Sequence, residues 1–478
     1  MLFNSFEFLI FFPVVSFLYF LLPHKYRWLL LLVSSAIFYM AFIPVYIFIL
    51  AFTIIIDYFA AILIESAAGK KRKAFLIVSI IANIGVLAIF KYYDFFIVNF
   101  NSLLHVFHFT THSFPLLKII LPIGLSFHTF QAISYTVEVY KGKQVAERHF
   151  GIYALYIMFY PQLVAGPIER PQNLLHQFHE KHKFDNDRIA KGLRLILWGM
   201  FMKIVIADRL AIYVNPVYQN VSEHNGTTLL LATLFFSIQI YCDFAGYSFI
   251  ALGCAEVMGF KLMNNFNRPY FSKSISEFWT RWHISLSSWF RDYIYIPLGG
   301  NKVSVPGWVL RLLLVFFLSG LWHGADWKFI IWGLLNGLFI VFSVLVKKWR
   351  KVFSERFNVA GSNRLYTFIQ IITTFLLCNF AWIFFRANNI SDAFVIIHKI
   401  FFKPGPLFTG FPATVIPYCL FGILTLLFVE IKKEFFPSRF LLLSNKNEYV
   451  RYTGYVMAVV VIILLGVFDG GQFIYFQF

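Results

Sequence analysis

Charged residues are scarce in this sequence. Of its 478 residues 13% are Asp, Glu, Lys or Arg, whereas about 25% is usual for a soluble globular protein. Apolar residues make up 59% of the chain and aromatic residues 21%. Uncharged runs long enough to hold bilayer passes recur at 8–23, 28–56, 74–90, 119–137, 329–346, 365–385 and 452–468. We therefore expect an all-α polytopic membrane protein, with about eleven transmembrane helices plus re-entrant or interfacial helices.

Cysteine is rare as well. The four cysteines lie in or beside apolar runs without C-x-x-C spacing, and they are Cys242, Cys254, Cys378 and Cys419. This pattern indicates neither a zinc site nor a disulfide framework, and it is typical of inert small hydrophobic side chains. The P-loop, dinucleotide-binding, G-x-S-x-G and H-E-x-x-H motifs are missing too. We expect no bound cofactor and no metal.

The positive charge is gathered in short clusters between apolar runs. These clusters are Lys25 and Arg27, Lys70 to Lys73, Lys141 and Lys143, and Lys347, Lys348, Arg350 and Lys351. The positive-inside rule places such loops in the cytoplasm and the N-terminus outside. The first apolar run follows Glu7 and lacks a cleavage site, so it reads as a retained pass. The net charge of +18 then reflects topology and contact with membrane lipid rather than nucleic-acid binding.

No long polar segment interrupts the sequence, so residues 1–478 read as a single membrane-embedded domain. Between residues 160 and 337 the apolar runs are shorter and are broken by charges, prolines and glycines. Irregular backbone is tolerated at membrane depth only where it packs against protein or lines a water-filled cavity. We therefore place a cavity and the catalytic core at about residues 120–340.

His323 is the first functional candidate. It lies within the run SGLWHGADWKFIIWGLLNG, residues 319–337, and a titratable ring is costly in such apolar surroundings. The alternative is a packing histidine bonded to a carbonyl. As one helix, residues 308–346 would extend about 58 Å, so a break is expected at Gly320 and Gly324. Such a break could offer backbone N–H groups to an oxyanion, or it could be a plain turn between two passes.

Residues 266–300 interleave charged and aromatic residues over the length of one long helix. Ser274 and Glu277 predict a capping box at its start, and residues 297–300 predict its end. Arg281 and Asp292 fall on its polar side and His283 at the edge of its aromatic stripe. An interfacial helix without a catalytic duty would have the same composition. A second histidine close to His323 in sequence favours proton transfer instead.

Two further polar residues stand out in apolar surroundings. Asp243 lies in YCDFAGYSFIALG, residues 241–253, where a structural hydrogen bond and a donor-binding role are equally compatible with the pattern. Gln162 lies in YPQLVAGPIERP, residues 160–171, which reads as a re-entrant loop or the end of a pass. We include Asp243, Gln162 and Asp292 among the candidate substrate-binding residues.

At these segments the sequence resembles the membrane-bound O-acyltransferase family, in particular its alginate and peptidoglycan O-acetyltransferase branch. The matching runs are LPIGLSFHTFQAISYTVEVYKG, YPQLVAGPIERP, YCDFAGYS, NFNRPYFSKSISEFWTRWHISLSSWFRDYIYIPLGGN, SGLWHGADWKFIIWGLLNG and the terminal FIYFQF. Relatives commonly carry Asp where Phe249 stands and His where Asn336 stands. The contribution of those two positions to substrate choice is therefore open here.

The resemblance implies a multi-pass enzyme of the bacterial inner membrane with a central funnel. Such an enzyme moves an acetyl group from a cytoplasmic thioester, acetyl-CoA, toward an extracytoplasmic polysaccharide such as alginate, often through a secreted partner with an SGNH-hydrolase-like fold. The family's essential histidine corresponds to His323 and its second histidine to His283. On this reading His323 is the general base, His283 orients or polarises the reacting groups, and Arg281 contacts the donor's phosphates. The funnel would be lined by Arg281 and by Trp279, Trp282 and Trp322.

Three alternatives remain at this stage. Within the family, the enzyme could transfer D-alanine to teichoic acid from a carrier-protein thioester. A transporter would also need a basic polytopic chain with intramembrane Asp and His. A catalytically silent scaffold for a partner acyltransferase is the third possibility.

Overall fold

The computed structural model describes residues 1–108, 113–164, 166–346, 364–410, 412–436, 443 and 445–468. Within these ranges the regular structure is helical and no strand occurs, so the predicted all-α fold class is confirmed. The chain forms two compact units. The first comprises residues 1–196 and 250–263, and the second comprises residues 197–249 and 264–478. The description of residues 1–478 as a single domain stays a prediction.

Eight helical segments of the described residues are long and apolar enough to cross a membrane. They are Pro44–Ser66, Gly69–Val106, Gly226–Met258, Val305–His323, Trp327–Leu345, Arg364–Arg386, Val415–Phe435 and Glu448–Leu465. The helix Phe6–Leu21 is apolar but shorter. A polytopic membrane protein is thus confirmed, while the count of about eleven passes depends on shorter helices and stays a prediction.

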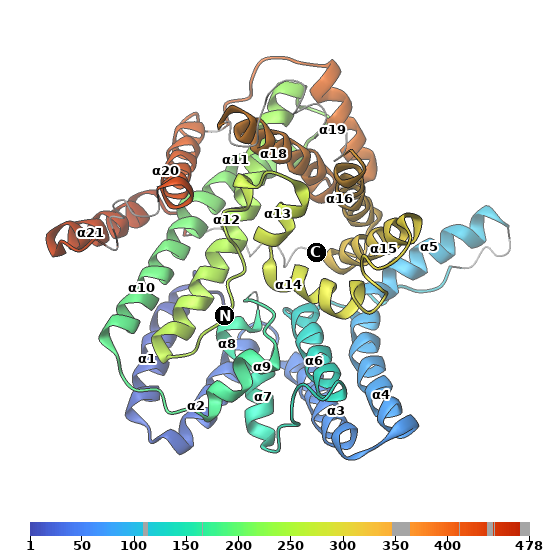
Figure 1. Cartoon of the computed structure of the whole chain (residues 1–478). Helices are drawn as coiled ribbons and strands as arrows, with labels where there is room; N and C mark the ends of the chain where they lie inside the picture. Colours follow the sequence, from blue (N-terminus) through green and yellow to red (C-terminus); the bar gives the residue numbers. More distant parts are fainter. Residues whose placement is uncertain are drawn as a thin grey trace. The chain divides into compact units, whose positions relative to one another are not determined.

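The first unit contains the N-terminal helices. They are α1 (Phe6–Leu21), α2 (His24–Met40), α3 (Ile47–Ser66), α4 (Gly69–Leu87), α5 (Tyr93–Val106), α6 (Leu125–Tyr140), α7 (Phe150–Met158), α8 (Tyr160–Leu163) and α9 (Pro171–Leu174). Helices α3, α4 and α6 pack against one another (Figure 1). On α3 the buried Asp57 accepts hydrogen bonds from Ser79 at 2.6 Å and Asn83 at 2.9 Å, both on α4. The carboxylate therefore has a structural role in joining two apolar helices.

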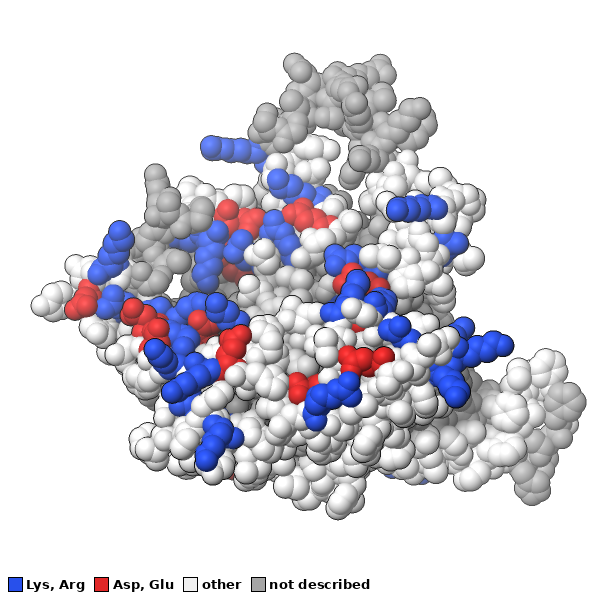
Figure 2. Space-filling model, turned by 60° about the horizontal axis from the view of Figure 1, so that its bottom comes forward, with Lys and Arg blue, Asp and Glu red and all other residues white. Residues whose placement is uncertain are grey.

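Two of the basic loops lie at the same end of the first unit. Arg72, after α3, donates 2.7 Å to the carbonyl of Tyr140 at the end of α6. Glu65 accepts a hydrogen bond from the backbone N–H of Ala146 at 3.1 Å. Figure 2 shows a face on which lysines and arginines gather together with acidic side chains. The shared location of these loops is what the positive-inside rule requires; the basic run 347–351 lies outside the described residues.

The second unit holds the remaining helices. They are α11 (Asp208–Gln219), α13 (Ile275–Arg281), α14 (Ile284–Phe290), α15 (Val305–His323), α16 (Trp327–Leu345), α18 (Arg364–Arg386), α19 (Ile390–Phe402), α20 (Val415–Phe435) and α21 (Glu448–Leu465). The residues of α10 (Asn186–Met200) and α12 (Gly226–Met258) are divided between the two units. Short π-helical segments cover Phe201–Ala207 and Arg291–Tyr295.

The long helix predicted over residues 274–296 is wrong, because the chain breaks in its middle. The start is as predicted, since the Ser274 hydroxyl accepts from the Glu277 backbone N–H at 3.1 Å. Helix α13 ends at Arg281, and α14 begins at Ile284. Between them His283 has a φ of +43°, a left-handed conformation that is costly for a residue with a Cβ. The helical spacing of the aromatic residues does not reveal this break.

A buried ion cluster joins α12 to the neighbouring π-helical segment. The Nζ of Lys203 lies 2.8 Å from a carboxylate oxygen of Asp208 and 2.7 Å from one of Asp243. All three side chains are buried. A Cβ on Gly246, also on α12, would lie 2.8 Å from the carbonyl oxygen of Gly199, so the backbones approach closely here. One ammonium group thus compensates two carboxylates that would otherwise be costly to bury.

We expect Lys203→Met to destabilise the protein by about 3–5 kcal/mol, because it removes the ammonium group with which two buried carboxylates pair. Thermal unfolding of the purified protein in detergent would measure the loss. Lys191→Met is the matched control, since the Lys191 side chain, which pairs with Glu256, is 59% exposed, and exposed pairs contribute about 0–1 kcal/mol. Equal unfolding temperatures for the two variants would contradict the role given to the cluster.

Candidate functional site

His323 is the last residue of α15, and it is enclosed by aromatic rings. Its ring centroid lies 4.8 Å from that of Trp332, 4.9 Å from that of Trp322 and 5.5 Å from that of Phe385. The side chain is 3% exposed. This arrangement places a proton-accepting group in low-dielectric surroundings.

The break beside His323 is a turn between two separate helices. Helix α15 continues through Gly320 and ends at His323, so only Gly324 of the two predicted positions lies in the break. Asp326 caps α16 by accepting from the backbone N–H of Lys328 at 3.0 Å. The break is therefore a turn between two passes, and its use of backbone N–H groups to hold an oxyanion stays a prediction.

Glycines allow the backbones of α15 and α16 to touch. A Cβ on Gly320 would lie 2.3 Å from the carbonyl oxygen of Phe329 on α16. A Cβ on Gly333 would lie 2.2 Å from the carbonyl oxygen of Phe316 on α15. Neither position has space for a larger residue. Because Gly320 precedes His323 by less than one helical turn, this contact also sets where the imidazole lies.

His283 lies in the same unit, between α13 and α14, and is completely buried. Its ring packs 4.6 Å from that of Phe244 and 6.1 Å from that of Trp322, measured between centroids. Trp322 thus contacts both histidines. Burial lowers the pKa of His283 to about 3, so its ring is neutral at physiological pH.

Tryptophans from three helices form a wall beside the histidines. Trp332 of α16 packs against Trp279 at 5.8 Å and against Trp382 at 5.6 Å between ring centroids. Trp382 of α18 also packs 5.1 Å from Trp282. Sequence reasoning missed Trp332 and Trp382, because a tryptophan in an apolar run is usually assigned to core packing or the membrane interface. Trp332 lies in the same apolar run as His323, and this is the sequence feature that could have identified it as a site residue.

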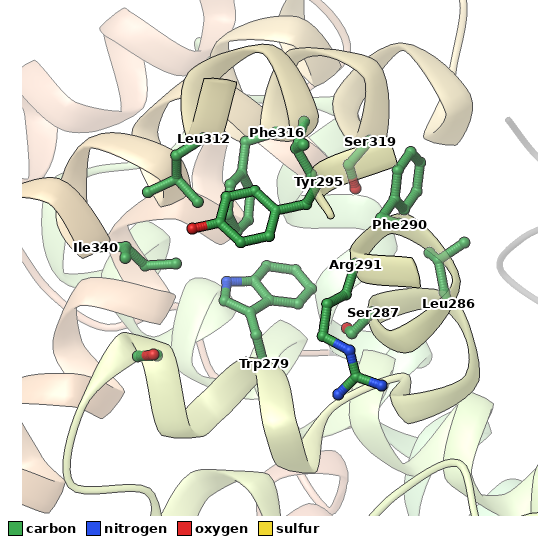
Figure 3. Close-up of a pocket in the computed structure, with 12 residues that line it drawn as sticks. Trp279, Leu286, Ser287, Phe290, Arg291, Tyr295, Leu312, Phe316, Ser319 and Ile340 are labelled. Carbon is green, nitrogen blue, oxygen red and sulfur yellow. The ribbon is translucent and has the colours of Figure 1, made fainter. Parts of the chain in front are cut away.

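A cavity of about 160 Å³ lies in the second unit. Its walls come from α13 to α16 and the π-helical segment, with lining residues that include Trp279, Arg291, Tyr295, Leu312, Phe316 and Ser319. Figure 3 shows the rings of Trp279 and Tyr295 opposite each other, with Arg291 extending beside Trp279. Ser319 lies one helical turn before His323. The cavity therefore comes within one helical turn of His323 along α15, and its described lining residues include neither histidine.

Comparison with known proteins identifies the chemistry. The profile of the membrane-bound O-acyltransferase family matches residues 147–383, which include both histidines. A "Probable alginate O-acetylase" of Pseudomonas aeruginosa is 37% identical over 405 residues, covering 84% of this chain and 75% of the relative. A "Peptidoglycan O-acetyltransferase" of Helicobacter pylori is 35% identical over 432 residues, covering 83% and 79%. A "Teichoic acid D-alanyltransferase" of Bacillus subtilis is 29% identical over 279 residues, covering 56% and 69%.

The chain belongs to the membrane-bound O-acyltransferase family. The predicted enzyme class, an O-acyltransferase, is confirmed by the family and by the O-acetyltransferase relatives. The predicted location, a multi-pass protein of the bacterial cell membrane, is confirmed by the family and by the eight apolar helices. The terminal FIYFQF run that contributed to the resemblance lies outside the described residues.

The residues predicted for the O-acyltransferase site fall into two groups. His323, His283, Trp279, Trp282 and Trp322 come together in the second unit. Their catalytic and binding roles stay predictions.

The other candidates are engaged elsewhere in the structure. Arg281 pairs with Glu434 at 2.9 Å and with Glu277 at 2.8 Å, so two carboxylates hold the guanidinium proposed for donor phosphates. Asp292 pairs with Arg291 at 2.8 Å, and Asp243 pairs with Lys203. Gln162 belongs to the first unit and donates 2.9 Å to the carbonyl of Tyr156. The substrate-binding roles of these residues stay predictions as well.

Metal ligands are not grouped anywhere in the described part of the chain, where no three His, Cys, Asp or Glu side chains are arranged to hold an ion. The four cysteines are all buried thiols.

We expect Gly320→Ala to reduce acyl transfer strongly and to lower stability by about 1–3 kcal/mol, because the added methyl meets the backbone of Phe329. The matched control is Gly337→Ala on α16, where the nearest atom, at 3.0 Å, belongs to the flexible end of Leu313. Thermal unfolding and transfer rates measured in parallel would compare them. Equal losses in the two variants would show that the α15–α16 contact does not position His323.

Proposed function

We propose that this O-acyltransferase moves an acetyl group from a cytoplasmic thioester, acetyl-CoA, to a hydroxyl presented for O-acetylation of an extracytoplasmic polysaccharide, with His323 as general base. The observation that carries the proposal is the enclosed imidazole at the end of α15. It packs against Trp322, which also packs against His283, and it lies one helical turn after Ser319, a residue that lines the cavity. A secreted acetyltransferase with an SGNH-hydrolase-like fold is a candidate partner for delivery to the polymer.

The reaction needs a neutral imidazole. His323 accepts the proton of the acceptor hydroxyl while the hydroxyl oxygen attacks the thioester carbonyl carbon. The carbon–sulfur bond then breaks, and the leaving thiolate takes up the proton. The ring is regenerated and no net proton is consumed. His283, which is neutral, can hydrogen-bond to one of the reacting groups and orient it.

The cavity offers a route for the donor. Helices α15 and α16 are antiparallel, so the start of α15 and the end of α16 lie at one membrane surface. The sequence directly after α16 contains the basic run 347–351, which the positive-inside rule assigns to the cytoplasm. Along α15 the cavity runs from Leu312 to Ser319, toward His323. A cavity of about 150 Å³ can hold a molecule the size of benzene, so the acetyl end of a thioester is an appropriate occupant.

Arg291 is the residue proposed to bind the negatively charged phosphates of the donor. Its side chain is 62% exposed at the edge of the cavity, where it pairs with Asp292. The planar guanidinium suits a phosphate group, which acetyl-CoA carries at the other end of its thiol arm. Since Arg281 is held by two carboxylates, Arg291 is the better candidate for this contact.

The acetyl group is favoured over D-alanine by the extent of similarity. The acetylase relative matches 84% of the chain at 37% identity, and the D-alanyltransferase relative matches 56% at 29%. Membranes containing this protein, supplied with either acetyl-CoA or a D-alanyl carrier protein, would separate the two by which thiol is released. A transporter would move an intact solute without cleaving either thioester.

We expect His323→Ala to reduce acceptor-dependent release of coenzyme A from acetyl-CoA by about 10²- to 10⁴-fold, because general-base assistance is lost. Membrane vesicles with a thiol-reactive dye would report the rate. His398→Ala is the matched control, since that histidine lies on α19 of the same unit with an exposed side chain. Release at the wild-type rate by the His323 variant would refute the assignment.

A further inference from the structure

We propose that Asn265 is a positioning residue that fixes the tautomer of His283, with the proton on Nδ1 and a lone pair on Nε2. The inference deepens the proposed function, because it rests on the assignment of His283 to the acyl-transfer site. It concerns an asparagine in the irregular segment before α13, a residue without catalytic chemistry of its own.

The amide orientation of Asn265 follows from its neighbours. One side-chain atom of Asn265 lies 3.2 Å from the backbone nitrogen of Ser285. A backbone N–H can only donate, so this atom must be the oxygen Oδ1 rather than the nitrogen Nδ2. The hydroxyl of Ser285 lies 2.9 Å from the same atom and can donate to it as well. The other end of the amide faces the hydroxyl of Ser248 at 3.5 Å.

The tautomer of His283 then follows, because Oδ1 of Asn265 can only accept a hydrogen bond. The Nδ1 of His283 lies 3.1 Å from Oδ1 of Asn265, and an amide oxygen cannot donate a proton. Nδ1 must therefore carry the hydrogen. In a neutral imidazole only one nitrogen is protonated, so Nε2 has the lone pair. Asn265 is 1% exposed and His283 is completely buried, so water does not compete for these groups.

Two backbone hydrogen bonds hold the segment that carries Asn265 beside His283. The N–H of Ile284, the first residue of α14, donates 2.9 Å to the carbonyl of Asn265. The N–H of Asn267 donates 2.9 Å to the carbonyl of Arg281, the last residue of α13. The segment 265–267 therefore spans the break between the two helices. It also stabilises the left-handed conformation of His283, which would otherwise cost free energy.

The ring of His283 remains neutral in these surroundings. Phe244 of α12, Phe266 and Trp322 of α15 pack around it. The nearest acidic residue in the sequence of α12, Asp243, is paired with Lys203. Burial lowers the pKa of His283 to about 3, so the Nε2 lone pair persists throughout the physiological range. An acceptor nitrogen of this kind can receive a hydrogen bond from a hydroxyl and orient its oxygen for attack.

The direct test is ¹⁵N NMR of the full-length wild-type protein, labelled at histidine and reconstituted in lipid nanodiscs. The His283 signals are assigned by their loss in His283→Gln. We expect the protonated nitrogen to be Nδ1. A protonated Nε2 would overturn the proposal, whatever the activity of the protein, and the His283→Gln variant used for assignment has to fold but need not be active.

Asn265→Asp tests the positioning role in the reaction. The carboxylate still accepts from Nδ1, but its charge raises the pKa of His283, and the active neutral ring is lost as pH falls through that raised pKa. We expect the pKa of His283, followed by ¹⁵N NMR of this variant, to rise by at least one unit. Ser248→Ala, which alters only the other end of the Asn265 amide, should leave that pKa in place. An unchanged pKa of His283 in the folded Asn265→Asp protein would contradict the positioning role.

The two proposals can fail separately. If His283→Gln transfers acetyl groups at the wild-type rate, the role of His283 in the proposed function fails, while the NMR result still decides the tautomer. If the NMR shows protonated Nε2 in an enzyme that needs His283, the function stands and the role of Asn265 fails.

Discussion

The contact between the backbones of α15 and α16 is the constraint on which the site depends. Gly320 and Gly333 each face a carbonyl oxygen of the opposite helix at a distance that a Cβ could not tolerate. With small residues at the contact, two membrane helices can pack closely without a hydrophobic driving force between them. Because α15 ends at His323 and α16 carries Trp332, the same contact brings the imidazole against the indole. The closely packed helix pair thus positions the imidazole and its aromatic surroundings together.

The electrostatics of the second unit follow from the way its polar groups are buried. The carboxylate of Asp243 is compensated by Lys203, and Arg281 is compensated by Glu277 and Glu434. The two histidines instead lie among aromatic rings. Burial keeps the imidazole of His283 neutral, which is the form that can accept a hydrogen bond. The fold therefore separates these ion pairs from the two histidines proposed for the reaction.

Sequence patterns predicted the membrane class, the family and the two histidines. Low charge and long apolar runs indicate bilayer passes, and the GLWHGA and RWHISLS runs locate His323 and His283. The break at His283 could not be predicted, because the aromatic spacing on both sides continues a helical pattern. It depends on Asn265, which is distant by 18 residues and looks like an ordinary loop asparagine. Trp382 and Glu434 likewise reach the site through tertiary packing from helices that carry no local signal of it.

The central claim is that a thioester reaches the imidazole of His323 from the cytoplasmic end of α15. It can be tested with Ser319→Cys, since Ser319 lines the cavity and the four native cysteines are buried. Inside-out and right-side-out vesicles would be treated with a small, charged thiosulfonate reagent in the presence or absence of acetyl-CoA. The account predicts labelling of the new thiol from the cytoplasmic side and protection by acetyl-CoA. Labelling from the opposite side alone, or labelling that acetyl-CoA leaves unchanged, would contradict it.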